Sequence, residues 1–241
     1  MYNPRTIAQV KELYPNINWD RFFVETMGIN TPDTLIVTEI NSVKQADNLM
    51  ASLTDREKKD YYLWKYVAQA AGMLSDDFTN TAFDFNKVVS GVQEQRPRWK
   101  RALGVPDSYM GEAIGRLYVE KHFPETSKQR MEQLVGNLID AYRVSISNSI
   151  WLGDETKAKA LEKLSKFVPK IGYTNHWRDY SALDVREDAG FAQNMRAANL
   201  YETGYQLAKV GKAVDKDEWL MNPQTVNAYY EPTMNVIVFP A

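Results

Sequence analysis

The residues of this chain best suited to hold a metal ion are its two histidines, His122 and His176. They lie far apart in the sequence, and neither belongs to an H-E-x-x-H pattern, in which two histidines one helical turn apart share a zinc ion. His122 follows Glu120 near the end of an expected helix, where an imidazole interacts favourably with the helix dipole. His176 lies in a polar loop beside Trp177. Both histidines are therefore expected to be structural or solvated, and we expect no metal ligand in this chain.

Nucleophilic and acid–base catalysis also lack a recognisable pattern. The chain has no cysteine, and no serine lies in G-x-S-x-G or S-x-x-K spacing with suitable partners. Neighbouring carboxylates such as Asp154 and Glu155 fall in the first turn of an expected helix, where negative charge is favourable. No phosphate-binding glycine loop occurs, and the four-residue spacing of Gly111 and Gly115 is more typical of close helix packing. The sequence therefore predicts no self-contained catalytic site.

One pair of residues, Asn227 and Ala228, has the chemistry to bind a peptide backbone. The two stand in the middle of Val226–Tyr230, a run that is expected to be a β-strand. At a sheet edge, the free N–H and C=O groups of such a strand can pair with an extended peptide. The Asn227 amide offers donors and an acceptor, and the small Ala228 side chain leaves the approach open. A plain hairpin, in which Asn227 pairs across the strands, explains the same spacing, and spacing alone favours it.

Helices are expected to make up most of the scaffold that positions these residues. Apolar residues recur at three- and four-residue steps along Ser127–Trp151, the clearest helix, and Thr54–Glu57 forms a capping box that opens another. A further helix is expected to start at Pro106, and Thr34–Ile40 reads as an extended segment. Residues 225–239 differ, because β-branched and aromatic residues flank a turn there. The sequence therefore predicts a mainly α chain with a C-terminal β-hairpin.

The composition describes a folded protein without nucleic-acid-binding character. Of its 241 residues, 44% are hydrophobic and 12% aromatic, which is enough to bury a substantial core. The 29 Lys and Arg residues against 31 Asp and Glu give a net charge of −2, with no basic stripe to bind a phosphate backbone. The first residues lack the apolar core of a signal peptide, and no apolar run approaches membrane-spanning length. Nucleic acid is therefore excluded as a partner.

Matches to one family extend along essentially the whole chain. Val226–Tyr230, followed after the turn by the run Asn235–Ala241, closely resembles the V-N-A-[FY]-Y…N-x-I-V-F-P-A pattern of the neprilysin family of zinc endopeptidases. Further matches stand upstream in the order of the family: Tyr2-Asn3 with Thr6, Ala8 and Gln9, then Ala113–Val119, Trp151 with Thr156-Lys157, Ile171–Tyr173, and Val214–Lys216 with Glu218-Trp219. Long colinear matches of this kind are far more specific than a single short motif.

The resemblance implies a zinc metallopeptidase built from two lobes around an enclosed cavity. One lobe is a largely helical domain that restricts access to short peptides. The other is a thermolysin-like catalytic domain, in which the glutamate of H-E-x-x-H acts as general base on the zinc-bound water. In the family the N-A-[FY]-Y strand borders the active site, so the resemblance assigns Asn227 and Ala228 to holding the substrate backbone. The family's zinc ligands lie beyond the V-F-P-A run, so zinc is expected in the full-length parent and not in this chain.

These expectations divide the chain into two parts. Residues 1–212 are predicted to form the helical cavity-covering domain with connecting helices, and residues 213–241 the start of the catalytic domain, a hairpin whose remaining sheet strands are elsewhere. The partners are then a peptide substrate and the C-terminal catalytic portion of the same protein, without which the chain should be inactive. The exposed hairpin edge is expected to permit dimerisation. By resemblance, the parent lies outside the cytoplasm, in the periplasm, at the cell surface or secreted.

Two alternatives remain open from the sequence. The chain could be a stand-alone helical binding module, or a degenerate family member without enzymatic activity. It could also be one half of a nicked enzyme that regains activity when its C-terminal partner is added. Assaying peptide hydrolysis after mixing the halves separates the last case from an inert fragment.

Overall fold

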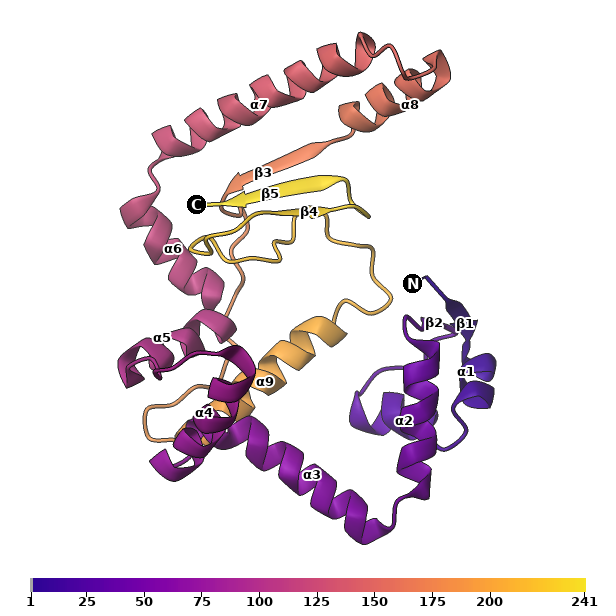
Figure 1. Cartoon of the computed structure of the whole chain (residues 1–241), viewed down its shortest axis with the longest axis vertical. Coiled ribbons are helices and arrows are strands. Elements are labelled where there is room, and N and C mark those ends of the chain that lie inside the picture. Colours follow the sequence, from indigo (N-terminus) through magenta and orange to yellow (C-terminus); the bar gives the residue numbers. More distant parts are fainter. Residues whose placement is uncertain (1) are drawn as a thin grey trace. The chain divides into compact units, whose positions relative to one another are not determined.

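The fold is taken from a computed structural model, which describes residues 2–241. The chain is mainly helical with two small sheets (Figure 1). The helices are α1 (Ile7–Leu13), the π-helical turn η1 (Arg21–Thr26), α2 (Ile40–Ser52), α3 (Asp55–Ala70), the 3-10 turn η2 (Ala71–Met73), α4 (Asp76–Ser90), α5 (Arg98–Tyr109), α6 (Gly111–His122), α7 (Glu125–Ser147), α8 (Asp154–Ser165) and α9 (Phe191–Leu207). The strands are β1 (Pro4–Thr6), β2 (Thr34–Ile36), β3 (Val168–Gly172), β4 (Tyr229–Glu231) and β5 (Val236–Pro240). Among the described residues, no helix is long and apolar enough to cross a membrane.

Two compact units divide these elements. The first comprises Met1–Gln95, Glu187–Arg196 and Thr203–Val210, and the second comprises Arg96–Arg186, Ala197–Glu202 and Gly211–Ala241. Helix α9 therefore contributes residues to both units. The predicted boundary between residues 212 and 213 concerns the domains of a larger parent enzyme and stays a prediction.

The first unit has its best-packed residues beside its small sheet. Strand β1 pairs antiparallel with β2, which confirms an extended segment at Thr34, although helix α2 already begins at Ile40. Val10 and Tyr14 are buried, and the Tyr14 hydroxyl donates to the Ile40 carbonyl at 3.2 Å. These contacts hold the start of α2 against the end of α1.

Helix α3 confirms the predicted capping box. The Thr54 hydroxyl accepts the Glu57 N–H at 3.3 Å, and the Thr54 N–H donates to the Glu57 carboxylate at 2.8 Å. These bonds satisfy N–H groups that an α-helix leaves unpaired at its first turn. Although the cap defines where α3 begins, no residue of the helix is buried.

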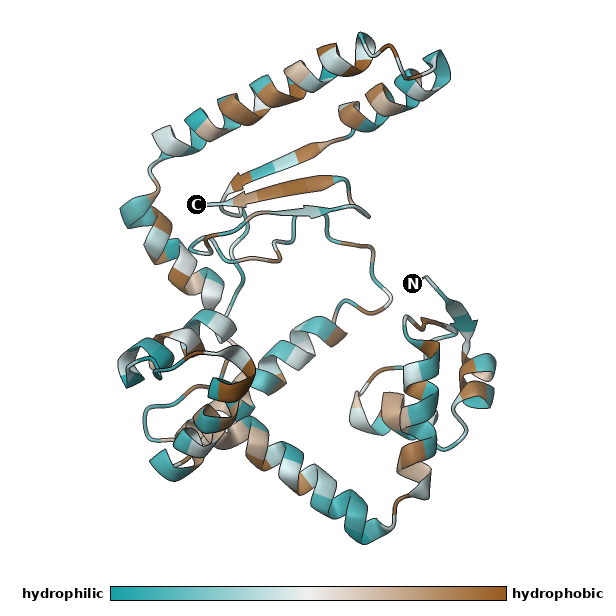
Figure 2. Ribbon diagram, in the orientation of Figure 1, coloured by the Kyte–Doolittle hydropathy of each residue, from teal (hydrophilic) through white to brown (hydrophobic). Residues whose placement is uncertain are grey.

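The second unit contains a three-stranded sheet in the order β3–β5–β4. Strand β5 runs antiparallel to β4, as the predicted hairpin requires, and parallel to β3. Val236 and Val238 are almost fully buried, and Figure 2 shows β5 as the most hydrophobic strand of this sheet. Apolar side chains of α7 and α8 line a cavity of about 500 Å³ together with Ile237 and Phe239 of β5. Pairing with β5 positions β4 and the residues that adjoin it.

Two predictions about this unit are wrong. The sheet of the hairpin was expected to have its other strands elsewhere, but β3 lies within the chain and pairs with β5. The helix expected to start at Pro106 is two helices, because Pro106 lies inside α5 and α6 begins at Gly111. A proline near the end of a helix removes only one backbone hydrogen bond, and the Pro106 carbonyl still accepts the Met110 N–H at 2.7 Å.

Candidate functional site

Asn227 and Ala228 lie at the surface immediately before β4. Both residues are exposed, and so is Val226. The sequence places them in the middle of a strand, whereas the strand begins at Tyr229. The β4–β5 register explains the difference, because its continuation sets Asn227 opposite Pro240, which has no N–H to donate. The Asn227–Ala228 pair is therefore not paired across the hairpin.

The hydrogen-bond pattern of β5 shows which backbone groups of β4 face outward. The Val168 N–H donates to the carbonyl of Asn235, the residue before β5, at 3.1 Å. Ile237 and Phe239 of β5 therefore also direct their backbone toward β3. Val236 and Val238 then direct theirs toward β4. Since Tyr230 lies opposite Ile237, its own N–H and C=O point away from β5. No strand among residues 2–241 pairs with this outer side of β4.

The opposite edge of the sheet is less suited to strand addition. Val168, Lys170 and Gly172 direct their backbone toward β5, so Pro169 directs its nitrogen outward. Proline has no N–H there, and a proline at an outward position is a common means of blocking strand addition. The two edges thus differ, and β4 carries the open one.

The Asn227 side chain has one hydrogen bond and spare capacity. Its Oδ1 atom accepts the Ala228 N–H at 2.8 Å, while its backbone N–H donates to the Thr225 carbonyl at 2.9 Å. No hydrogen bond from its Nδ2 group to another described residue occurs. The Asn227–Ala228 pair therefore offers an amide donor and a carbonyl acceptor at the edge.

The loop that carries this pair, Leu220–Tyr229, is closed at its base. The Leu220 N–H donates to the Tyr229 hydroxyl oxygen at 2.9 Å. Burial raises the pKa of the Tyr229 hydroxyl above its ordinary value. The hydroxyl is therefore neutral at physiological pH and accepts the bond as a phenol.

The middle of the Leu220–Tyr229 loop packs on the junction of α5 and α6, named here the α5–α6 corner (Asp107–Gly115). A Cβ atom on Gly111 would lie 2.0 Å from Asn222 Nδ2, and one on Gly115 would lie 2.5 Å from Pro223 Cδ. Only glycine permits so close an approach. The spacing of the two glycines indicated close helix packing. The partner is instead a loop more than 100 residues away in sequence, which no local pattern reveals.

Comparison with known proteins assigns the chain to a family. A sequence model of peptidase family M13 matches residues 1–174, which is most of the chain. The chain belongs to peptidase family M13. Neutral endopeptidase of Lactobacillus helveticus is 31% identical over 242 residues, covering 100% of this chain and 37% of that protein. Endothelin-converting enzyme 1 of Rattus norvegicus is 31% identical over 254 residues, covering 100% of this chain and 33% of that enzyme.

Solved structures of this M13 chain's relatives share its fold. The zinc metalloprotease Zmp1 of Mycobacterium tuberculosis, in complex with an inhibitor, superimposes with a TM-score of 0.90 at 37% identity, covering 99% of this chain and 36% of that one. PepO from Lactobacillus rhamnosis superimposes with a TM-score of 0.84 at 25% identity, over 99% of this chain and 38% of that one. This M13 chain thus spans about a third of the length of the relatives that it matches.

The residues that the structure describes in this M13 chain do not form a zinc site. Within residues 2–241, no three histidine, aspartate or glutamate side chains gather where they could hold a metal ion. His122 lies 5.2 Å from the Tyr118 ring, measured between ring centroids. The backbone N–H of His176 donates to the Thr174 hydroxyl at 3.0 Å. The His122 ring thus has an ordinary structural contact, and His176 lines a polar cavity together with Thr174.

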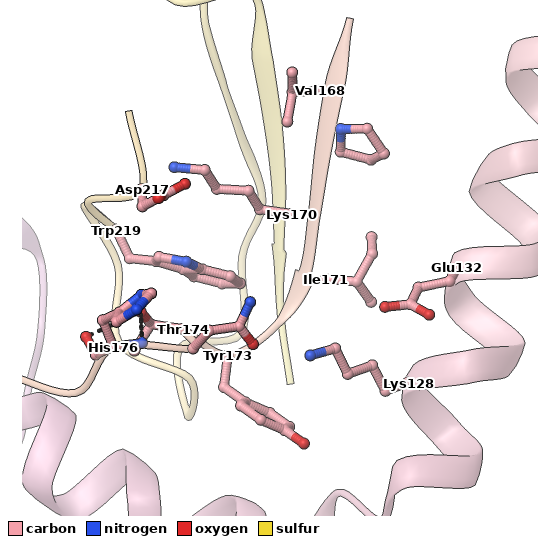
Figure 3. A pocket seen from close by; sticks show the side chains of 12 residues that line it. Lys128, Glu132, Val168, Lys170, Ile171, Tyr173, Thr174, His176, Asp217 and Trp219 are labelled. Atoms are coloured by element: carbon pink, nitrogen blue, oxygen red, sulfur yellow. Dashed lines mark hydrogen bonds between the residues drawn. The ribbon is translucent and has the colours of Figure 1, made fainter. Parts of the chain in front are cut away.

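A polar cavity of about 240 Å³ lies between β3, α7 and the loop that contains Asp217 (Figure 3). The Lys170 ammonium group donates to the Glu218 carbonyl at 3.1 Å and also to the Lys216 carbonyl. Burial lowers the pKa of Lys170, and Asp217 nearby opposes that shift. Because the lysine is bound to two backbone carbonyls, its role is to hold this loop against β3.

Proposed function

We propose that this chain is the part of an M13 zinc metalloendopeptidase that confines short peptides and holds their backbone at the edge of β4. The observation that carries the proposal is the exposed Asn227–Ala228 pair beside an open strand edge, in a chain of family M13. The names of the relatives, a zinc metalloprotease and a neutral endopeptidase, support a peptidase as the parent.

The binding step uses backbone pairing and one side chain. An extended peptide adds to the outer side of β4, where the Tyr230 N–H and C=O pair with its main chain. The Ala228 carbonyl accepts a peptide N–H, and the Asn227 Nδ2 group donates to a peptide carbonyl. Main-chain pairing gives affinity without reading side chains, which suits a peptidase that accepts many short sequences.

Hydrolysis belongs to the C-terminal catalytic portion of the same polypeptide, where we expect the zinc ion. Residues 1–212 are assigned to the helical cavity-covering domain and residues 213–241 to the start of the catalytic domain. Because the chain spans about a third of its relatives, we expect no peptide hydrolysis from it alone. A location outside the cytoplasm is proposed for the parent, and fractionation of the source cells tests it.

The open edge also offers a place for a second copy of this chain. Two β4 edges could pair antiparallel across a two-fold axis, and the dimer would then compete with peptide. Sedimentation at several concentrations, with and without a short peptide, measures this competition. Peptide should shift the chain toward monomer.

NMR titration of the ¹⁵N-labelled chain with a short peptide, blocked at both ends, tests the proposal. The titration gives the affinity of the chain for the peptide and shows which amide signals shift. Asn227→Ala should weaken binding about tenfold, because one or two hydrogen bonds to the peptide are lost. The amide signals of Ala228 and Tyr230 should shift in the unsubstituted chain.

Asn86→Ala is the matched control, since Asn86 is an exposed asparagine on α4 in the first unit. It should leave the affinity unchanged. Equal affinities for all three chains, or titration shifts that avoid β4, would contradict the proposal.

A further inference from the structure

The position of the Asn227–Ala228 pair is set by contacts made several residues earlier in the Leu220–Tyr229 loop. Val226 is fully exposed and Asn227 and Ala228 are exposed as well, so side-chain packing does not hold them. Pro223, in contrast, is buried. The fixed point of the loop is therefore Asn222–Gln224, where it meets the α5–α6 corner.

We propose that Asp107 and Gln224 are positioning residues that hold the Asn227–Ala228 pair ready to bind a peptide. The inference rests on the proposed function, because it assigns these residues a role in peptide binding. Neither residue itself touches the peptide. It adds Asp107 on helix α5 and Gln224 in the loop to the residues on which binding depends.

Three hydrogen bonds join the loop to the corner. Gln224 Nε2 donates to Asp107 Oδ1 at 2.5 Å and to the Gly111 carbonyl at 3.1 Å. Asn222 Nδ2 donates to the Asp107 carbonyl at 3.0 Å. The Gln224 Oε1 atom is buried with no hydrogen-bond partner among the described residues. The amide group is thus held by its nitrogen, which points to Asp107 as the group that fixes it.

The location of Asp107 supports a specific role for its side chain. It lies near the C-terminal end of α5, where a negative charge interacts unfavourably with the helix dipole. A carboxylate there destabilises the helix end, so the stability of α5 does not account for an aspartate at this position. The bond to Gln224 does, because a carboxylate is a strong acceptor for an amide N–H group.

A series of local hydrogen bonds connects the α5–α6 corner to the Asn227–Ala228 pair. The Thr225 N–H donates to the Asn222 carbonyl at 3.0 Å, and the Asn227 N–H donates to the Thr225 carbonyl at 2.9 Å. The Ala228 N–H then donates to Asn227 Oδ1 at 2.8 Å. Each bond starts from the residue that the previous one fixed. Gln224 directly precedes Thr225, so loss of the Asp107–Gln224 bond should loosen Thr225 and, through it, Asn227 and Ala228, while the bond from Asn222 to the Asp107 carbonyl remains.

A loosened loop binds peptide more weakly, because it must be ordered at the moment of binding. The variants Asp107→Ala and Asp107→Asn separate the effect of the hydrogen bond to Gln224 from the effect of the negative charge. Asparagine retains an Oδ1 acceptor for Gln224, whereas alanine does not. Asp107→Ala should weaken peptide binding about tenfold, a typical cost of ordering a short segment, and Asp107→Asn should restore most of the affinity.

The experiment measures three quantities on the whole chain: affinity for a short blocked peptide, unfolding by urea, and ¹⁵N relaxation of the Asn227 and Ala228 amides. In Asp107→Ala the two amides should become more mobile without peptide present, while α5 and α6 remain folded. Gln224→Ala removes this bond together with the bond to the Gly111 carbonyl, and it serves if Asp107→Ala fails to fold. Asp84→Ala, an exposed aspartate on α4, is the control and should change none of the three.

The outcomes distinguish this inference from the proposed function. If the unsubstituted chain binds no peptide, the proposed function fails, but increased mobility in Asp107→Ala still supports the positioning role. The positioning role is overturned if the unsubstituted chain binds peptide and neither Asp107→Ala nor Gln224→Ala changes the peptide affinity or the mobility of the Asn227 and Ala228 amides. Equal weakening by Asp107→Ala and Asp107→Asn would also overturn it, because the charge rather than the hydrogen bond would then be responsible.

Discussion

At the residue scale, Glu231 holds the turn between β4 and β5. Its carboxylate accepts the Thr233 hydroxyl at 2.5 Å and the Thr233 N–H at 2.9 Å. The Thr233 hydroxyl, followed by its N–H, lowers the pKa of Glu231 below the ordinary value. Because the folded-state pKa is lowered, the stabilisation is complete above the ordinary glutamate pKa and is lost as the pH falls through the folded-state value.

We therefore expect the turn to loosen as the pH falls below about 4, after the unfolded-state carboxyl has begun to protonate near its ordinary pKa. An NMR titration of the Glu231 carboxyl measures its pKa directly. In Thr233→Ala that pKa should rise toward the ordinary value, and in Thr203→Ala, at an exposed threonine on α9, it should not move. An unchanged pKa in Thr233→Ala would show that the turn does not depend on these bonds.

Tyr229 closes the base of the Leu220–Tyr229 loop with a single hydrogen bond. Tyr229→Phe leaves the Leu220 N–H without its acceptor and should lower the free energy of unfolding by about 1 kcal/mol. Hydrogen exchange of the Leu220 amide should become faster. Tyr142→Phe is the control, because the Tyr142 ring is largely exposed. Unchanged exchange at Leu220 would contradict the closure.

At the element scale, α6 and the loop approach each other through Gly115. Gly115→Ala would place a Cβ atom 2.5 Å from Pro223 Cδ, so overpacking should destabilise the chain by about 1–3 kcal/mol. Gly136→Ala on α7 is the matched control, because nothing lies within 4 Å of its added Cβ. It should stabilise the chain by about 0.5–1 kcal/mol through helix propensity. Urea unfolding checks both, and two stabilised variants would refute the close contact.

The elements that the sequence predicts well are those with local causes. The capping box of α3 and the helix predicted over Ser127–Trp151 depend on residues a few positions apart. The box is confirmed, and so is the helix, although α7 spans Glu125–Ser147 and stops short of Trp151. Strand β3 was missed because Val-Pro-Lys-Ile-Gly has no alternation and contains a proline. Its pairing with β5, 68 residues later, depends on tertiary contacts. Local patterns carry no information on such pairing.

The candidate site shows the same division. Asn227 and Ala228 could be identified by their resemblance to a family pattern. Their place just before β4, rather than within it, depends on Pro240 across the hairpin. The contact of Gln224 with Asp107 joins residues 117 positions apart. Sequence reasoning therefore finds the exposed pair and misses what positions it.

At the scale of the whole molecule, the chain exposes more surface than its mass requires. Its accessible surface is 17795 Å², whereas two separate compact domains of half its mass would together expose about 13,000 Å². The surplus includes large apolar side chains on α3 and α4, such as Trp64 and Val88, and neither helix has a buried residue. We propose that this surface contacts the rest of an M13 polypeptide.

The isolated chain should therefore bind an apolar dye such as anilinonaphthalene sulfonate in native buffer and self-associate as its concentration rises. Adding the remaining portion of the polypeptide should reduce dye fluorescence, because the apolar faces of α3 and α4 become covered. A monodisperse chain without dye binding would show that these faces need no partner.

The central claim is that a peptide backbone lies along β4 beside the Asn227–Ala228 pair. Intermolecular nuclear Overhauser effects between a bound short peptide and the labelled chain test it most directly. We expect contacts from the peptide to the Tyr230 amide proton and to the Asn227 Nδ2 protons. Contacts confined to the cavity around Lys170, or to the apolar faces of α7 and α8, would contradict the claim.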